Sequence, residues 1–132
     1  MPTLETLKAL ADETRLRILS ILDQSDELCA CEIEAVLGLN QSNASRHLAR
    51  LRAAGLVTAR KQGHWVHYTL DAASPHAPLA ARALNAAREE HDRLREDLEL
   101  LRDYRSSGHS CETIGAWDRE RSGRQAPGLP VE

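Results

Sequence analysis

The pair Cys29 and Cys31 carries the side chains best suited to chemistry in this chain. Thiolates are soft ligands for thiophilic ions, and the N–H groups at a helix N-terminus lower the pKa of a nearby thiol. Because the pair stands at or just before the start of a predicted helix, we expect both thiols to favour the thiolate form. Side chains two residues apart diverge by about 200° on an ideal helix, whereas they share one face of an extended segment. Binding of one ion by both thiols therefore requires the first turn to be extended or to unwind.

The third cysteine of the chain, Cys111, lies in a segment rich in Ser, Gly and Pro, residues 106–132. We expect residues 105–132 to form a flexible C-terminal tail. Folded back, in its own subunit or across a dimer, Cys111 would complete a site of three sulfurs, although ordering the tail costs conformational entropy. Without it, the pair would bind an ion together with water or a small thiol. The alternative interpretation is that Cys29 and Cys31 are small buried apolar residues.

A stretch without a single acidic residue runs from Ala35 to Leu70, although the whole chain has a net charge of −3. Its charged side chains are all basic: Arg46, Arg50, Arg52, Arg60 and Lys61. A basic block inside an acidic chain favours a face that binds a polyanion. The alternative is a solvated surface that happens to lack acids.

The elements that must position these residues follow from apolar spacing and from turn residues. A first helix is predicted at Leu4–Leu10, and Asp12 is a good N-cap for a second helix that ends at a polar loop, Asp23–Glu27. We further expect a short helix over Ile33–Leu37 that Gly38 closes, a helix over 41–54, strands over 57–61 and 65–70 joined by a Gln62-Gly63 turn, and a long helix over 79–104.

Two helices joined by a tight turn and followed by a β-hairpin form the order of a winged helix-turn-helix. The predicted fold class is therefore mostly α with a β-hairpin wing. The second of the paired helices would enter the major groove of DNA with its polar face, and the hairpin tip would lie along an adjacent groove. The candidate DNA-binding residues are Gln41, Ser42, Asn43, Ser45, Arg46, His47, Arg50, Arg60, Lys61, Gln62 and His64.

The apolar residues of the long predicted helix alternate in steps of four and three, which is the pattern of a coiled-coil seam. Such a seam on a terminal helix favours a homodimer. The candidate dimer-interface residues are Leu84, Ala87, His91, Leu94, Leu98 and Leu101. We accordingly expect a DNA-binding and dimerisation domain over residues 1–104, followed by the tail.

Three segments carry a resemblance to a known family. Leu37–Val57, which reads LGLNQSNASRHLARLRAAGLV, resembles the recognition segment of the ArsR/SmtB family of bacterial metal-sensing repressors. Ala11–Leu19, ADETRLRIL, resembles the start of that family's second helix, and Asp26–Ile33, DELCACEI, is similar to the cysteine signature of its arsenic-responsive members. The resemblance covers about residues 4–104. It implies a homodimer that binds double-stranded operator DNA when unliganded and releases it when a metalloid binds.

The resemblance also implies trivalent arsenic or antimony as the inducer, bound by Cys29 and Cys31, and no organic cofactor; Cys111, the remaining thiol, is the candidate third ligand. This chain departs from the arsenic-responsive signature, which often carries another cysteine three residues after the second, because Glu34 stands there. Some members of the family sense oxidants or persulfides, and a pairing of Cys31 with Cys111 is the corresponding alternative. A disulfide between Cys29 and Cys31 would be strained.

Other classes of protein are less compatible with the sequence. Three cysteines is an odd count, so we expect no closed disulfide framework. No apolar run approaches the roughly 18 residues that cross a membrane, and the N-terminus lacks the pattern of a secretory signal, so we expect a cytoplasmic protein with no membrane partner. No cysteine has a base and a scaffold beside it, so we expect no enzyme activity. A pure dimerisation module would leave the acid-free basic stretch unexplained.

Overall fold

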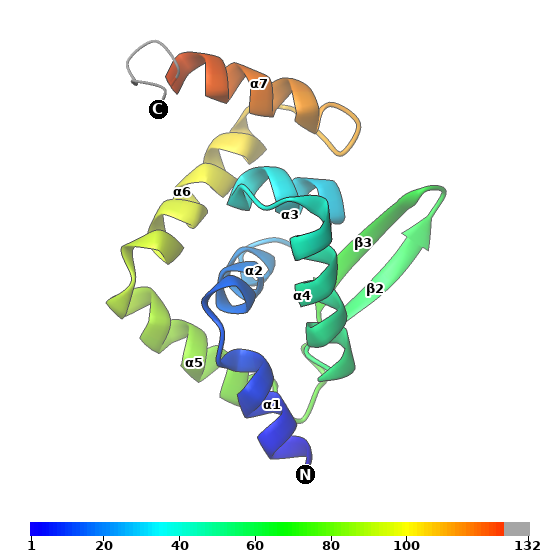
Figure 1. The fold of residues 1–132 in the computed structure, drawn as a ribbon, viewed down its shortest axis with the longest axis vertical. Helices are drawn as coiled ribbons and strands as arrows, with labels where there is room; N and C mark the ends of the chain where they lie inside the picture. Colours follow the sequence, from blue (N-terminus) through cyan, green and yellow to red (C-terminus); the bar gives the residue numbers. More distant parts are fainter. Residues whose placement is uncertain (126–132) are drawn as a thin grey trace.

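The computed structural model describes the backbone of residues 1–125 and the side chains of residues 1–121. Its elements are α1 (Pro2–Leu10), α2 (Glu13–Asp23), β1 (Leu28–Cys29), α3 (Ala30–Leu37), α4 (Gln41–Ala53), β2 (Val57–Gln62), β3 (Trp65–Leu70), α5 (Ala77–Glu90), α6 (Asp92–Ser106) and α7 (Ile114–Gln125). The pair α3 and α4, followed by the projecting β2–β3 hairpin, forms a winged helix-turn-helix (Figure 1), which confirms the predicted fold class. Among the described helices, none combines the length and the apolar character needed to cross a bilayer.

Capping residues that are visible in the sequence determine where α2 and α4 begin and where α3 ends. The Asp12 carboxylate accepts a hydrogen bond from the backbone N–H of Arg15 at 3.0 Å, so Asp12 caps α2 as predicted. Asn40 caps α4 in the same way. Gly38 ends α3 with a φ of 70°, a left-handed conformation that side chains disfavour. The tight turn between α3 and α4 therefore rests on residue types that are visible in the sequence.

The strand β1 was not expected from the sequence, which predicts a loop over Asp23–Glu27 and the start of a helix close to Cys29. It consists of two residues and pairs with β3, so the sheet order is β1-β3-β2 and all pairs are antiparallel. Cys29 lies opposite His67 in this ladder. The sheet thereby fixes the backbone of the first cysteine next to the base of the wing.

The hairpin turn of the wing is displaced by one residue from the expected Gln62-Gly63. Gln62 is still in β2 and pairs with Trp65, so the two turn residues are Gly63 and His64. Gly63 has a φ of 63°. A two-residue hairpin turn needs positive φ at its first position, and this requirement explains why glycine occupies the turn.

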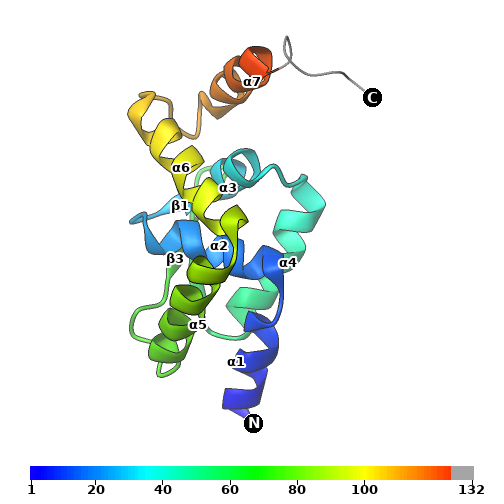
Figure 2. The same cartoon turned by 90° about the vertical axis from the view of Figure 1, so that its left-hand side faces the viewer.

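The hydrophobic core surrounds α2. This helix contacts α1, α3, α4, α5, α6 and β3, and Figure 2 shows it among the other helices. Its residues Ile18, Leu19, Ile21 and Leu22 are at most 1% exposed. Because the chain has no Phe, the core is mostly aliphatic.

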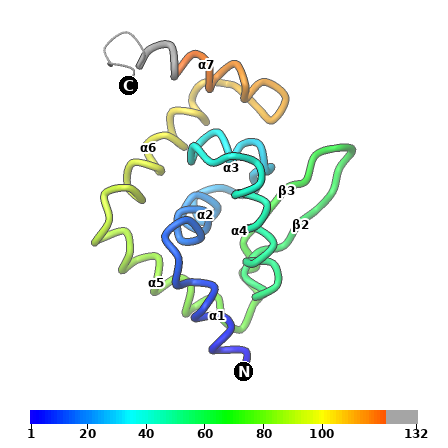
Figure 3. The backbone as a smooth tube through the Cα atoms, viewed as in Figure 1, coloured from blue at the N-terminus to red at the C-terminus, as the bar shows by residue number. Residues whose placement is uncertain are grey.

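The prediction of one continuous helix over residues 79–104 is wrong at His91. This residue is extended, with φ −119° and ψ 116°, and it separates α5 from α6, which meet at an angle (Figure 3). The Arg95 guanidinium donates to the backbone carbonyl of Arg88 and so satisfies a group that the end of α5 leaves open. The break lets both helices contact α2.

Because of this break, most of the apolar residues that the sequence assigns to a dimer interface face the core of their own chain. Four of its members are at most 6% exposed within the single chain: Leu84, Ala87, Leu94 and Leu101. Leu98 packs partly against the core, and His91 is exposed. Most of the stripe thus contributes to the core of one chain, and contact of these residues with a second subunit stays a prediction.

The flexible tail expected over residues 105–132 is corrected for residues 105–125, while residues 126–132 lie outside the described residues. α6 continues through Ser106, and α7 packs on α3. The inner side of α7 carries Ile114 and Trp117, which are 7% and 1% exposed. Ser107, Gly108 and Ser110 occupy the loop before α7, whereas α7 itself includes Gly115, Ser122 and Gly123. Two apolar residues three positions apart form one side of that helix.

Candidate functional site

The thiols of Cys29 and Cys31 converge where β1 meets α3. Cys29 is the N-cap residue of α3 and has extended dihedrals, φ −81° and ψ 164°, while Cys31 lies in the first helical turn. Their Sγ atoms are 2.8 Å apart. The expectation of an extended segment is therefore met at Cys29, and no unwinding of α3 is needed to bring the sulfurs together.

Cys111 joins this pair from the loop that precedes α7. The three Sγ atoms of Cys29, Cys31 and Cys111 all lie within 4.8 Å of one another. The Cys31 thiol also lies 3.7 Å from the backbone carbonyl of Cys111 and can donate to it. All three thiols belong to the same chain, so the structure contains a cluster of three sulfurs within one subunit.

The expected activation of the thiols is not found. The pKa of Cys29 is raised to about 12, mainly because burial disfavours the thiolate and to a smaller extent because the Glu32 carboxylate repels it. Burial also raises the pKa of Cys31 and of Cys111. Desolvation of the charged form therefore outweighs the helix N-terminus, and the three thiols are protonated at neutral pH.

Glu32 connects the cluster to α6, and its role was not foreseen from the sequence. One carboxylate oxygen accepts the backbone N–H of Cys29 at 2.8 Å and so completes the cap of α3. The other accepts the hydroxyl of Tyr104. The position of Glu32, three residues after an N-cap, is the sequence signal that could have identified the first contact, whereas Tyr104 is 72 residues away along the chain.

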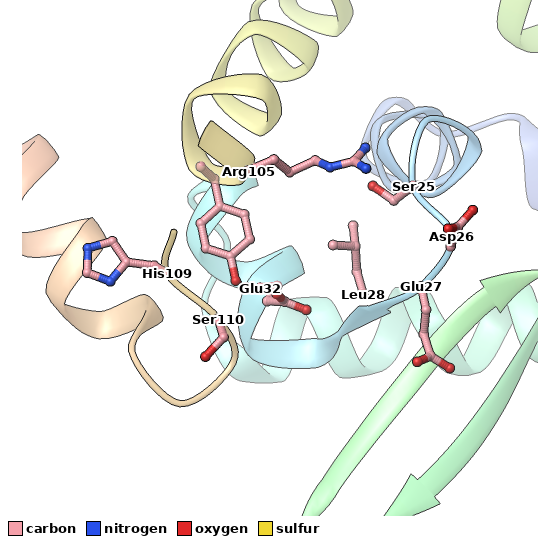
Figure 4. Close-up of a pocket in the computed structure, with 9 residues that line it drawn as sticks. Ser25, Asp26, Glu27, Leu28, Glu32, Arg105, His109 and Ser110 are labelled. Atoms are coloured by element: carbon pink, nitrogen blue, oxygen red, sulfur yellow. Dashed lines mark hydrogen bonds between the residues drawn. The ribbon is translucent and has the colours of Figure 1, made fainter. Parts of the chain in front are cut away.

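A polar pocket of about 370 Å³ opens beside the cluster. Figure 4 shows Glu32 between α6 on one side and the Ser25–Leu28 segment on the other, with His109 and Ser110 at the far wall. Arg105 reaches across and donates to the backbone carbonyl of Gln24 at 2.7 Å. The pocket gives solvent and small polar molecules a route to the side of Glu32.

The outer face of α4 presents most of the predicted DNA-binding residues. Gln41, Ser42, Ser45, Arg46 and Arg50 are exposed, and Asn43 is half-buried. The Asn43 side chain accepts a hydrogen bond from Arg46. Arg46 and Arg50 also line a shallow pocket together with Arg15 of α2. This arrangement places three guanidinium groups beside the recognition helix, and Arg15 lies outside the acid-free stretch that the sequence singled out.

His47 does not share that outer face. Its side chain is 12% exposed, and its Nδ1 atom lies 3.2 Å from a guanidinium nitrogen of Arg15 and 3.7 Å from the carboxylate of Asp12. Burial lowers the pKa of His47. The same Arg15 donates to the backbone carbonyl of Ala9 at 2.6 Å. His47 therefore contributes to the joint between α4, α2 and α1, and a direct contact with phosphate stays a prediction.

The wing carries a smaller positive charge than its sequence suggests. Lys61, Gln62 and His64 are exposed near its tip. Arg60 pairs with Glu27 at 2.8 Å, and this partner comes from the loop before β1, outside the acid-free stretch. The hydrogen bond from Arg60 lowers the pKa of Glu27. One of the five basic residues counted in the sequence is thus already paired.

The helix α3 lies between the thiol cluster at its N-terminal end and the recognition helix α4, which follows its C-terminal end. A groove of about 540 Å³ runs along α3 from Cys31 to Asn40, the cap of α4, and α7 forms its other wall. At the C-terminal end of α3, the carbonyl of Leu37 accepts a hydrogen bond from Arg17 at 2.9 Å. One short helix, α3, therefore connects the thiol cluster to the start of α4.

Comparison with known proteins places this architecture in a family. Residues 12–59 match the family profile of the bacterial regulatory proteins of the arsR family. The arsenical resistance operon repressor of Escherichia coli (strain K12) is 48% identical over 85 residues, which make up 64% of this chain and 70% of that protein. The arsenic resistance transcriptional regulator ArsR1 of Pseudomonas putida is 48% identical over 63 residues, and these are 48% of this chain and about half, 49%, of that protein.

Solved structures give the same result. The homodimeric winged helix-turn-helix DNA-binding domain of a possible ArsR-family regulator from Mycobacterium bovis is similar with a TM-score of 0.58 at 33% identity, over 67% of this chain and 81% of that one. The antimony-specific transcriptional repressor AntR is similar with a TM-score of 0.53 at 31% identity, over 61% of this chain and 68% of that one. From its recognition segment, its fold and these relatives, the chain belongs to the arsR family of bacterial regulatory proteins.

Proposed function

We propose that this protein is a homodimeric repressor that binds operator DNA and releases it when trivalent arsenic or antimony binds Cys29, Cys31 and Cys111. The observation that carries the proposal is the cluster of three sulfurs, all within 4.8 Å of one another, on the helix that directly precedes the recognition helix. Three sulfurs are the set that a trivalent metalloid prefers, since thiolates are soft ligands. The arsenical and antimony repressors among the relatives support the same choice.

The three thiols are uncharged at neutral pH, which favours a ligand that binds them without adding net charge to the cluster. A trivalent metalloid hydroxide exchanges three hydroxyls for three sulfurs, and the thiol protons leave with the hydroxyls as three waters. No net charge then enters a cluster whose Cys29 is 1% exposed. A divalent cation held by three thiolates would leave a negative charge beside Glu32, and burial of such a charge is unfavourable. Zinc also prefers four ligands.

The DNA-binding part of the proposal rests on the exposed face of α4. Arg46 and Arg50 are exposed there, and Lys61 of the same acid-free stretch is exposed on the wing. Guanidinium groups can read guanine or bind phosphate. Because these charges displace counterions from DNA, operator affinity falls steeply with salt.

The dimer part rests on an exposed apolar side of α1. Leu4 and Leu7 are 44% and 46% exposed, three residues apart on one helix. Large exposed apolar side chains that lie together mark a surface for association. We therefore assign part of the subunit contact to α1, together with the outer side of α5 and α6. The relative from Mycobacterium bovis is a homodimer.

Communication between the sites follows the path through α3. Closing three sulfurs around one atom pulls the N-terminal turn of α3 toward the Cys111 loop. The Leu37 end of the helix is held by Arg17, so the pull is passed to Gly38 and the cap of α4. A coupling free energy of about 1–3 kcal/mol is typical of allosteric proteins and would lower operator affinity by about 5- to 150-fold.

Fluorescence anisotropy of labelled operator DNA tests the proposal. Fully reduced protein bound to the DNA is titrated with trivalent arsenic, with wild type, Cys29→Ser/Cys31→Ser and Cys111→Ser in parallel. We expect release by wild type, no release by the double variant, and weaker response by Cys111→Ser. A wild-type complex that survives saturating arsenic would contradict metalloid sensing.

A second candidate function uses the same sulfurs as a redox sensor. The Cys31 and Cys111 sulfurs lie within 4.8 Å of each other. A peroxide can oxidise these two thiols to a disulfide, with two electrons and two protons passing to the peroxide as it becomes water. Release of DNA by peroxide or by a persulfide donor, without release by arsenic, would favour this candidate over the first.

A further inference from the structure

The third sulfur of the cluster lies in a loop whose side-chain hydrogen bonds stay within the loop or reach α6 or α7, apart from the contact of the Cys31 thiol with the Cys111 carbonyl. Cys111 is half-buried and sits in the turn between α6 and α7. These hydrogen bonds give the loop its shape and tie it to α7, but most of them do not hold it against α3. The position of Cys111 is therefore decided by whatever holds α7 against the body of the protein.

Trp117 is the most buried of the α7 side chains that the structure describes, residues 114–121. It is 1% exposed, and its ring lies edge-on to the ring of Tyr104, with centroids 5.2 Å apart. Its indole N–H donates to the carboxylate of Asp103 at 3.0 Å. The guanidinium of Arg121 lies over the ring, 5.0 Å from its centroid. A buried aromatic side chain with a hydrogen-bond partner for its N–H and a cation over its ring is a strong anchor for a short helix.

A chain of contacts links Trp117 to the cysteine pair. Tyr104, on whose ring Trp117 packs, donates its hydroxyl to Glu32. Glu32 in turn accepts the N–H of Cys29. A single packed path thus joins Trp117 to the cap of the helix that carries Cys31, while the chain itself joins Trp117 to Cys111 over six positions.

We infer that Trp117 is a positioning residue that holds Cys111 against Cys29 and Cys31, so that the three-sulfur site exists before the metalloid arrives. The inference rests on the proposed function for its biological meaning. The third sulfur is then supplied within one subunit, and metalloid binding does not have to order the C-terminal segment. Apparent affinity varies with the fraction of molecules in which a site is formed. Loss of the anchor therefore weakens three-sulfur binding without removing a sulfur.

The test compares Trp117→Ala with Trp117→Phe, which keeps the ring contact with Tyr104, and with Trp65→Ala, which removes the other tryptophan, a wing residue. Two readouts are taken on the full-length reduced protein. The first is the yield of a bifunctional alkylating reagent that links Cys31 to Cys111 in a Cys29→Ser background, without any metalloid. The second is the number of sulfur ligands per arsenic by X-ray absorption, with the arsenic affinity.

For Trp117→Ala we expect a loss of most of the crosslink, a fall from three sulfur ligands to two, and an arsenic affinity at least about tenfold weaker. Trp117→Phe should recover much of the crosslink, and Trp65→Ala should match wild type. Circular dichroism checks that each variant keeps its helices. The ligand number is a readout that general destabilisation would not change in the folded fraction.

The outcomes separate the two ideas. An undiminished crosslink in Trp117→Ala overturns the positioning role, whatever arsenic does. A lost crosslink together with a wild type that binds no arsenic through sulfur supports the positioning role and refutes the proposed function. If Trp117→Phe loses as much crosslink as Trp117→Ala, the ring contact with Tyr104 is not the anchor, and the inference fails in that form.

Discussion

Replacing Asp97 by alanine would leave a buried guanidinium without its carboxylate. The side chains of Arg17 and Asp97 are 9% and 1% exposed, with the Arg17 Nε atom 2.8 Å from one carboxylate oxygen. A second bond of 3.0 Å makes the contact bidentate. Arg17 also donates to the carbonyl of Leu37 at 2.9 Å. The pair thereby joins α2, α6 and the turn that leads into the recognition helix.

The magnitude follows from the burial of both partners. Breaking a buried ion pair by removing one partner destabilises a protein by about 3–5 kcal/mol. Burial raises the pKa of Asp97, and the opposing effect of Arg17 is the smaller one. Desolvation therefore weighs heavily against the attraction within the pair, so replacement of both partners by apolar side chains of similar size should be nearly neutral.

Urea unfolding at one fixed protein concentration measures both effects, since a dimer's apparent stability depends on concentration. We expect Asp97→Ala to lose about 3–5 kcal/mol and Arg17→Met/Asp97→Leu to stay near wild type. The double variant also lacks the donor to Leu37, so its operator affinity should fall although its stability does not. A loss below about 1 kcal/mol in Asp97→Ala, or a double variant as unstable as the single one, would refute this reasoning.

Other substitutions test the charges that we propose to face DNA, and the buried thiols. Arg46→Ala should weaken operator binding and reduce the slope of log affinity against log salt by about one; Arg119→Ala, at an exposed residue of α7, is the charge-matched control, and equal slopes for the two variants would contradict the interface. Glu27→Gln releases Arg60 from its 2.8 Å ion pair, so operator binding should tighten severalfold in a gel-shift assay, and weaker binding would count against it. The pKa of Cys29 is raised from 9.0 to about 12, so the unfolded chain loses this proton first, and stability should decline as pH rises from about 9 to about 12. Urea midpoints of wild type and Cys29→Ala at neutral pH and about pH 10 check this, and parallel declines would contradict it.

Local signals in the sequence were sufficient for the helix-turn-helix and its wing. The cap at Asp12, the stop at Gly38 and the alternating residues of the second strand each depend on neighbours within a few positions. The error of one residue in the hairpin turn is of the size expected when the register is set by cross-strand pairing. These elements are local, and so a reading of residue types predicts them well.

The break at His91 and the packing of α7 could not be foreseen in the same way. Nothing about residues 79–104 by themselves stops a helix, because the bend is favoured by contacts of α5 and α6 with α2, far earlier in the chain. Trp117 likewise finds Tyr104 and Asp103 only after α6 has docked. A segment with many Ser and Gly residues therefore looked flexible although one buried aromatic residue orders it.

By itself the sequence determined which atoms are available: two thiols two residues apart, a third near the C-terminus, and basic side chains on one predicted helix. Only the tertiary structure decided that the three sulfurs meet within one chain, that their thiols stay protonated, and that His47 and Arg60 are engaged within the protein. Residue type fixes the chemistry that a side chain can perform. Proximity, desolvation and pairing arise from contacts between segments distant in the chain, and these exist only once the core has formed.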